Sequence, residues 1–351
     1  MRVKKYSEAI NEGIATAMEI DNNVICYGLG VPDPKGVFGT TLGLREKFGS
    51  KRVFDIPTSE NAMTGVAIGA SLNGIRPIFT HQRLDFFLLA MDQLINNAAK
   101  WSYMFGGQSS VPITIRLIIG RGWGQGPTHS QNLQAIFAHI PGLKVVMPAT
   151  AKDAKGLLLE SVFDNNPVVF LEHRWLHNLE GEVPAEDYRI PIGSGNLLNR
   201  GKNLTIVSSS YMTIEALHAV KKLEEKGIDC DLIDLRSVKP IDFNLIFNSI
   251  KKTGLLLALD TGVTSGSIAG EIIARSTIDC FDSLKKAPKR IALPDFPTPT
   301  SISLTKNFYK RANDIIKSVY LLVGKKLQSD SLIENNDIPP DVPGDWFKGP
   351  F

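Results

Sequence analysis

The sequence predicts an α/β protein made of two doubly wound domains. Short apolar runs alternate with amphipathic stretches twice along its 351 residues. The run 112–119 (PITIRLII) reads as almost continuously apolar, as expected of a strand buried on both faces of a parallel sheet. Polar sequence that contains Gly and Pro separates the two alternations between residues 173 and 203. Alternating strands and helices favour a mostly parallel sheet covered by helices on both faces.

The first alternation occupies residues 1–180 and forms the larger predicted domain. Its first helix starts near Ser7, where a hydroxyl can cap the chain and apolar residues follow at helical spacing. Strands are expected at 24–27, 53–54, 76–80, 112–119, 144–147 and 168–171. Helices are expected from 60, at 85–101, from about 130 and at 153–163.

A linker at 181–202 leads to a second, smaller α/β domain at 203–324. Its strands are expected at 204–208, 228–235, 255–259 and 290–293, with helices at 213–226, from 242, at 268–277 and at 304–321. The extended tail, 325–351, is polar and Pro-rich but contains Trp346 and Phe347 near its end. These aromatic residues predict docking of the tail onto a neighbouring surface, with disorder as the alternative.

Composition places the chain among ordinary globular proteins. Hydrophobic residues make up 43% and charged residues 21%, and the formal net charge is only +3. This small, scattered charge argues against nucleic-acid and membrane partners. Three widely separated cysteines form neither a disulfide framework nor a zinc motif and fit a reducing compartment. No stretch approaches the ~18 apolar residues of a membrane span, and the N-terminus lacks a signal-peptide core, so we expect a cytoplasmic protein.

The segment 55–70 carries the first candidate for chemistry. A proline turn delivers the Glu60 carboxylate to the start of a helix built from small residues, among them Gly65 and Gly69. Glycine inside a helix costs roughly 1 kcal/mol relative to alanine, so close packing against a partner or a ligand is expected to offset that cost. Glu60 is either a ligand-binding acid or a first-turn acid that favours the helix dipole.

The Gly-rich segment 120–127 is expected to form a mobile active-site loop. It contains Arg121 and Trp123 and is followed by His129, and histidine is the side chain best suited to move protons near neutral pH. The loop does not match the dinucleotide or Walker motifs, and the sequence contains no serine-hydrolase or HExxH motif.

A second polar group, His81, Gln82 and Arg83, follows the strand 76–80. Open α/β sheets bind ligands at this carboxyl edge. Arg83 can pair with a substrate carboxylate or phosphate, or with the neighbouring Asp85.

Several segments together resemble one family over about residues 5–323. They are 58–60 (TSE), 90–100 (AMDQLINNAAK), 129–131 (HSQ), 141–148 (PGLKVVMP), 153–157 (DAKGL) and 164–169 (DNNPVV). The sequence is similar to the beta subunit of the thiamine-diphosphate-dependent, decarboxylating component of 2-oxo acid dehydrogenase complexes. The resemblance implies a pyrimidine-binding domain followed by a transketolase C-terminal-type domain.

The resemblance also assigns roles to individual residues. Glu60 matches the glutamate that hydrogen-bonds the aminopyrimidine ring of thiamine diphosphate and stabilises its imino tautomer. Phe86 matches the aromatic residue stacked on that ring, and His129 matches an active-site histidine near the substrate and the acyl acceptor. A structural potassium site made of backbone carbonyls is implied at Ile113, Ser161, Val162, Asp164 and Asn166.

One motif that thiamine-diphosphate enzymes need is missing from these 351 residues. A Gly-Asp-Gly segment followed by Asn supplies hard oxygen ligands to the Mg²⁺ ion that holds the diphosphate. The only Gly-Asp here is Gly344-Asp345 in the tail. We therefore expect an alpha subunit to carry the Mg²⁺ ligands, in an α2β2 heterotetramer with the cofactor at the α–β interface. A lipoyl acyltransferase is the further partner that such complexes imply.

The sequence departs from the family where the substrate is expected. The departures are Thr80-His81-Gln82-Arg83, the 120–127 loop with Arg121 and Trp123, and 171–175 (LEHRW). Because these positions add Arg and His, we hypothesise a more polar or anionic substrate than pyruvate or a branched-chain oxo acid, such as a sugar-derived compound.

Three functions compete at this point. The leading prediction is decarboxylation of a 2-oxo acid followed by acyl transfer to a lipoyl group. The alternative enzyme is a split transketolase-like carboligase subunit that passes the activated unit to an aldehyde. A non-catalytic interaction subunit is the alternative outside enzymes, and the presence of Glu60 and His129 counts against it.

Overall fold

The computed structural model describes residues 2–120, 122–333, 338–344 and 347. The predictions made for Arg121 and Trp346 therefore lie outside the described residues. The described chain forms two compact units, one from residues of 1–121, 128–192 and 346–351 and the other from residues of 122–127 and 193–345. Each unit contains a mainly parallel sheet with helices packed on it, which confirms the predicted α/β class.

The first unit is built on six parallel strands in the order β6-β7-β5-β4-β2-β3. All residues of the neighbouring strands β5 and β7 are buried. Burial on both faces explains their largely apolar sequences. The strands are β2 (Val24–Tyr27), β3 (Val53–Phe54), β4 (Arg76–His81), β5 (Thr114–Ile119), β6 (Lys144–Val146) and β7 (Val168–His173).

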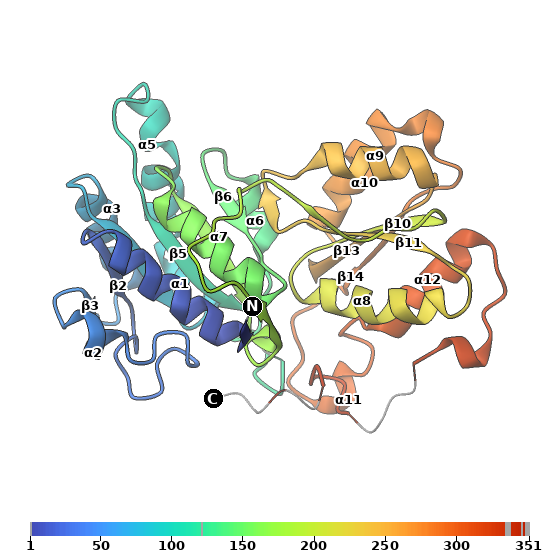
Figure 1. Cartoon of the computed structure of the whole chain (residues 1–351), viewed down its shortest axis with the longest axis horizontal. Coiled ribbons are helices and arrows are strands. Elements are labelled where there is room, and N and C mark those ends of the chain that lie inside the picture. Colours follow the sequence, from blue (N-terminus) through green and yellow to red (C-terminus); the bar gives the residue numbers. More distant parts are fainter. Residues whose placement is uncertain (1, 121, 334–337, 345–346, 348–351) are drawn as a thin grey trace. The chain divides into compact units, whose positions relative to one another are not determined.

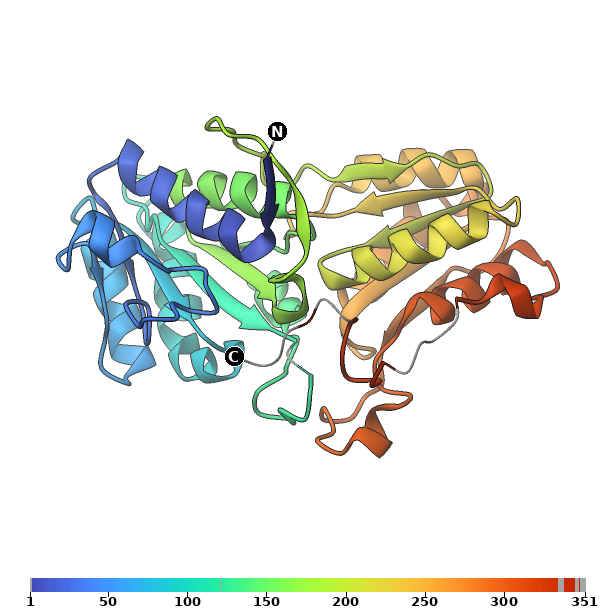
Figure 2. The ribbon, with the colours of Figure 1, turned by 60° about the horizontal axis from the view of Figure 1, so that its bottom comes forward.

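The helices of the first unit cover both faces of this sheet. Figure 2 shows α1 and α7 packed together on one side, and the helices between residues 60 and 104 on the other. The helices are α1 (Tyr6–Ile20), α2 (Leu44–Phe48), α3 (Glu60–Ser71), α4 (Leu84–Phe87), α5 (Ala99–Met104), α6 (Gln134–His139) and α7 (Ala151–Phe163). Two antiparallel strands, β1 (Arg2–Lys5) and β8 (Glu180–Val183), complete the unit.

The single helix predicted at 85–101 is instead a chain of short turns. A 3₁₀ turn (Leu88–Ala90) and a π-helical segment (Gln93–Ala98) lie between α4 and α5. Within the π segment, the Asn97 side chain donates to Gln93 Oε1 at 3.2 Å. The five-residue hydrogen-bonding step of a π turn widens the helix locally, and residue spacing alone does not reveal it.

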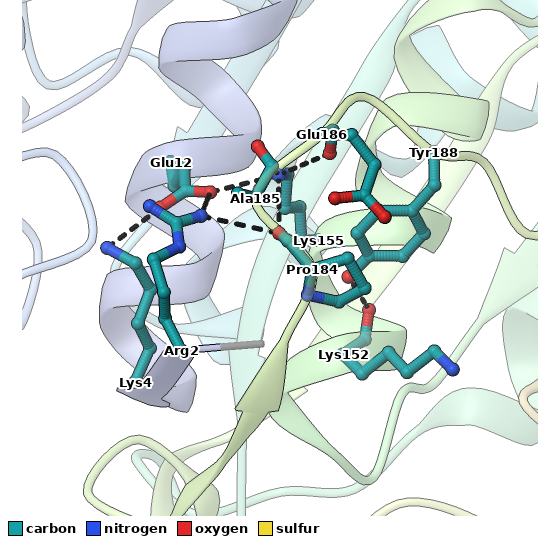
Figure 3. Close-up of polar contacts among 9 residues, drawn as sticks. All are labelled: Arg2, Lys4, Glu12, Lys152, Lys155, Pro184, Ala185, Glu186 and Tyr188. Carbon is teal, nitrogen blue, oxygen red and sulfur yellow. Dashed lines mark hydrogen bonds and ion pairs between the residues drawn. The ribbon is translucent and has the colours of Figure 1, made fainter.

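A buried lysine joins the N-terminal helix of the first unit to the segment after β8 (Figure 3). Lys155 of α7 is 1% exposed and its ammonium donates to Glu12 Oε1 at 2.9 Å. The same ammonium donates to the carbonyls of Pro184 at 3.2 Å and Glu186 at 2.9 Å. Arg2 and Lys4 of β1 also contact the Glu12 carboxylate, at 2.6 and 2.8 Å. The Glu12 carboxylate therefore forms ion pairs with cations from both β1 and α7.

This cluster predicts a loss of stability in acid. Burial disfavours the charged form of Glu12, but hydrogen bonds from Lys4, Lys155 and Arg2 outweigh it and lower the pKa of Glu12 to about 2. A carboxyl with a lowered pKa stabilises the fold above its ordinary pKa of 4.5, and this contribution disappears as the pH falls toward 2. We expect the loss to be about 1–2 kcal/mol after allowance for solvent screening.

Urea unfolding at several pH values would measure this contribution. Glu12→Gln should flatten the acid limb of the stability profile, and Glu46→Gln, an exposed carboxyl on α2, should leave it unchanged. Parallel profiles for the wild type and Glu12→Gln would contradict the expected role of Glu12.

The second unit has a five-stranded sheet in the order β14-β13-β10-β11-β9. All neighbouring strands are parallel except β9, which runs antiparallel to β11. Figure 1 shows α8 and α12 on one face of this sheet and α9 and α10 on the other. Its strands are β9 (Asn196–Asn199), β10 (Leu204–Ser208), β11 (Cys230–Asp234), β13 (Leu256–Val263) and β14 (Lys289–Leu293), and β12 (Ser237–Lys239) is a further short strand in the sequence of this unit. Its helices are α8 (Tyr211–Glu224), α9 (Phe243–Thr253), α10 (Ile268–Asp279), α11 (Ile302–Thr305) and α12 (Ala312–Val323).

Two regions without a clear pattern in the sequence have definite structure. The predicted linker, 181–202, contains residues 181–183 of β8 and all of β9, so part of it is strand. The described tail residues dock at two places. Within the second unit, the Asp341 carbonyl accepts from Trp123 N and its carboxylate from Gly124 N, both at 3.1 Å. Within the first unit, Phe347 is 9% exposed and its ring centroid lies 5.4 Å from the Arg174 guanidinium. Among the described helices, none is long and apolar enough to cross a membrane.

Candidate active site

The Glu60 side chain lies at the start of α3, where the chain leaves the short edge strand β3. Glu60 is partly buried, and its backbone carbonyl accepts a hydrogen bond from Thr64 Oγ1 at 2.8 Å. Within the described chain, no side chain or backbone N–H donates to the Glu60 carboxylate. This carboxylate can therefore accept a hydrogen bond from an incoming ligand at the carboxyl edge of the sheet.

The structure brings Phe86, His129 and Arg83 together. The Phe86 ring is 38% exposed and meets the His129 ring edge-on, with 5.5 Å between the centroids and 85° between the planes. The Arg83 guanidinium lies 5.6 Å from the Phe86 centroid. Asp85 accepts from Gln131 Nε2 at 2.8 Å, and this bond ties the segment that bears His129 to α4. The Phe86 ring thus contacts both an imidazole and a guanidinium.

His81 and Gln82 occupy different environments although they are adjacent in sequence. His81 is 6% exposed and packs between Phe79 and Phe87, and burial lowers the pKa of His81 to about 3. That position gives no support to a substrate contact by His81. Gln82 is partly exposed and donates from Nε2 to Leu29 O at 3.1 Å, so its amide lies at the carboxyl edge of the sheet.

The loop that follows β5 begins at a glycine that no other residue can replace without strain. Gly120 has a φ of +60°, and a Cβ there would lie 2.0 Å from His173 Nε2. Trp123, predicted to contact the substrate, is 42% exposed and clusters with the second unit, and Arg121 is outside the described residues. Substrate contacts by these loop residues remain predictions.

Comparison with known proteins shows the family to which this chain belongs. Residues 3–178 match the family described as the transketolase pyrimidine-binding domain, and residues 193–315 match the transketolase C-terminal domain. The 2-oxoisovalerate dehydrogenase beta subunit of Bacillus subtilis is 41% identical over 310 residues, which cover 88% of this chain and 95% of the relative. The chain belongs to the transketolase-like family of 2-oxo acid dehydrogenase beta subunits.

Other members of the family carry different activities in their names. The beta subunit of acetoin:2,6-dichlorophenolindophenol oxidoreductase from Cupriavidus necator is 40% identical over 317 residues, covering 88% of this chain and 94% of the relative. The pyruvate dehydrogenase E1 beta subunit of Rhizobium meliloti is 39% identical over 320 residues, covering 91% of this chain and 70% of the relative. The chain is about equally identical to these three relatives, so the comparison does not identify its substrate.

Structural comparison agrees on the fold. The structure of a split-gene transketolase, an inactive beta4 tetramer, aligns with a TM-score of 0.73 and 21% identity, covering 92% of this chain and 99% of that chain. At this identity the likeness concerns the fold alone.

The backbone carbonyls expected to form the family's potassium site lie close to an arginine. Arg76 Nη1 donates to the carbonyls of Val162 and Asp164 at 3.2 and 3.0 Å. Ile113 O accepts from Val168 N, and Ser161 O accepts from Asp164 N. Each of these oxygens already accepts a hydrogen bond, and the oxygens of Val162 and Asp164 accept it from a charged guanidinium. The K⁺ site therefore stays a prediction. Asn166 completes the predicted set, and its N–H donates to Asp164 Oδ1 at 2.8 Å.

The sequence analysis did not predict a buried ion pair that lies beneath the carboxyl edge of the sheet. Arg116 of β5 donates from Nε and Nη2 to Glu172 of β7 at 2.6 and 3.0 Å, and both side chains are fully buried. Arg116 Nη1 also donates to Thr80 Oγ1 at 3.2 Å. The sequence feature that could have indicated this pair was a single arginine inside the apolar run 112–119, together with a glutamate inside another central strand.

Proposed function

We propose that this chain is the beta subunit of a thiamine-diphosphate-dependent 2-oxo acid dehydrogenase that decarboxylates its substrate and transfers the acyl group to a lipoyl acceptor. The observation that carries the proposal is Glu60, a carboxylate at the carboxyl edge of the sheet to which no group in the described chain donates. It belongs to a pyrimidine-binding domain of the transketolase type.

The residues present suit the bound cofactor. When bound, thiamine diphosphate would supply the electron sink that decarboxylation needs. Glu60 would accept a hydrogen bond from the pyrimidine ring and hold its proton in place, and the exposed face of Phe86 would stack on that ring. His129, in edge contact with Phe86, would donate to or accept from the substrate and the lipoyl sulfur.

A partner subunit accounts for what this chain does not provide. Across the described residues, no group of three or more His, Cys, Asp or Glu side chains is placed to hold a metal ion. Helix α3 exposes Val66 (57%), and its Gly69 has open space where a side chain would be, so its small-residue face is free to receive another chain. Tyr103 of α5, at 92% exposed, is a further large side chain open to another chain. We infer an alpha subunit that binds Mg²⁺ and diphosphate in an α2β2 assembly.

Reconstitution with candidate alpha subunits tests this function. The purified pair should bind thiamine diphosphate only when Mg²⁺ is present and reductively acylate a lipoyl domain from a 2-oxo acid, whereas the beta chain alone should do neither. A polar or sugar-derived 2-oxo acid is expected to react faster than pyruvate, because the Arg83 guanidinium lies beside the Phe86 ring. Transfer to an aldehyde without lipoyl acylation would favour the split transketolase-like alternative.

We also propose that K⁺ binds the carbonyl oxygens around Val162 and Asp164. The ion would fix the turn between α7 and β7, where Asp164 also contacts Lys144. Replacing Na⁺ with K⁺ at constant ionic strength should raise the melting temperature of the full chain. The rise should level off as the K⁺ concentration increases, as expected for a site that saturates. Identical melting temperatures in the two salts would contradict a potassium site.

A further inference from the structure

The first unit contains a cavity of about 520 Å³ that the proposed function does not use. Its walls come from segments that are far apart in sequence: the loop 33–42 after β2, Gln82 after β4, and residues 174–178 after β7. Small-molecule sites are typically ~300–1,000 Å³. The cavity thus has the size of a ligand site and lies at the carboxyl edge of a parallel sheet, where such sites form.

Hydrogen bonds hold the wall of this cavity in place. Gly28 begins the loop with a φ of +153°, and a Cβ there would lie 2.1 Å from Thr80 O, so the loop packs directly on β4. Gly30 N donates to Asp55 Oδ1 at 3.1 Å, and Val37 N donates to Thr41 Oγ1 at 2.9 Å. A wall fixed before binding lowers the entropy that a ligand must lose.

The polar lining has a positive excess. Lys35 and Arg174 supply two cations against the single carboxylate of Asp33, and Gln82 and Asn178 supply neutral amides. Arg174 is 4% exposed, and its guanidinium stacks 4.5 Å from the centroid of Phe38. Stacking fixes the plane of the guanidinium, and a fixed fork of N–H donors suits carboxylate or phosphate oxygens.

His177 adds a buried imidazole whose Nδ1 has no hydrogen-bond partner within the described chain. The residue is 1% exposed and lines the cavity, and neither ring nitrogen makes a well-aligned hydrogen bond within the described chain. Its Nε2 lies 3.4 Å from Glu172 Oε2, and the ring stacks on Tyr6. Burial lowers the pKa of His177 to about 4 despite the nearby Glu172 carboxylate, so the imidazole is neutral at pH 7. With Nε2–H facing Glu172, Nδ1 can accept a hydrogen bond from a ligand.

We propose that this cavity is a binding site for a sugar-sized molecule that carries a carboxylate or a phosphate. Arg174 and Lys35 bind the anionic group, and His177, Gln82 and Asn178 bind hydroxyl groups. The volume exceeds that of a bare anion, and the neutral polar groups match a polyol. The site concerns the beta chain alone and does not depend on thiamine chemistry.

Calorimetry on the full chain, without thiamine diphosphate or a 2-oxo acid, tests the site with gluconate, glucose 6-phosphate and glucose. At least one of the two anions should bind saturably and about tenfold or more tightly than glucose, since a charged hydrogen bond contributes about 1.5–3 kcal/mol. Preference for gluconate would identify a carboxylate site, and preference for glucose 6-phosphate a phosphate site.

Variants separate this cavity from other sites. Arg174→Gln and Lys35→Gln should each weaken anion binding about tenfold, and Lys51→Gln, an exposed residue outside the cavity, should leave it unchanged. Lys35 is exposed, so Lys35→Gln should fold normally. This variant therefore tests the site even if Arg174→Gln fails to fold. Equal binding of anions and glucose, or full binding by both cavity variants, overturns the proposal. Because turnover is not measured, the result is independent of whether the proposed function holds.

Discussion

Replacing Glu60 with Gln is expected to lower kcat of the reconstituted enzyme by about 10²–10⁴-fold, the range of a positioned acid–base group. The amide keeps the size of the side chain at the start of α3 but cannot accept and share a proton as a carboxylate does. Single-turnover kinetics should show the loss in the decarboxylation step, and KM for the 2-oxo acid should change far less than kcat.

Two controls separate a catalytic effect of Glu60 from a general effect of charge or folding. Glu46→Gln removes an exposed carboxylate elsewhere in the first unit and should retain full activity. The melting temperature of Glu60→Gln should match the wild type, because no group in the described chain donates to the Glu60 carboxylate. Full activity of Glu60→Gln would remove the catalytic proposal and favour an interaction subunit that retains the fold.

Replacing Glu172 with Gln is expected to destabilise the first unit by about 3–5 kcal/mol, since it leaves the buried Arg116 charge uncompensated. Burial disfavours the charged form of Glu172, but Arg116 outweighs it and lowers the pKa of the Glu172 carboxyl. The pair is therefore charged at neutral pH. Urea unfolding of the full chain at pH 7 would measure the loss.

The matched double variant separates the charge effect from packing. Arg116→Met combined with Glu172→Met removes both charges from β5 and β7 and should recover most of the stability, as replacements of buried pairs by apolar residues often do. Glu46→Gln should stay within about 0.5 kcal/mol of the wild type. If Glu172→Gln were equally harmless, the ion pair would not contribute to the fold.

The residues placed by the family motifs were accessible from the sequence because their surroundings are local. Glu60 follows a proline turn and begins a helix, and both features can be read along one short segment. Phe86 and His129 were assigned separately by motif, and the structure brings their rings to 5.5 Å. That contact supports one site.

The cavity residues could not be assembled from the sequence because their association is not local. Lys35, Gln82 and His177 follow three different strands, and only the parallel pairing of those strands brings their carboxyl ends to one edge. Likewise, Arg116 and Glu172 form a pair because β5 and β7 are neighbours in the sheet although α6, β6 and α7 lie between them in sequence.

The sequence by itself determined the alternation of strands and helices, the two-domain organisation and the family, because apolar periodicity and contiguous motifs are properties of neighbouring residues. Tertiary structure alone decided which charges are buried together, that His81 packs among aromatic rings while the adjacent Gln82 lines a cavity, and where that cavity lies. The physical reason is that desolvation and ion pairing depend on which distant segments share a sheet edge, and sheet order is fixed by packing of the whole unit rather than by any one stretch of residues.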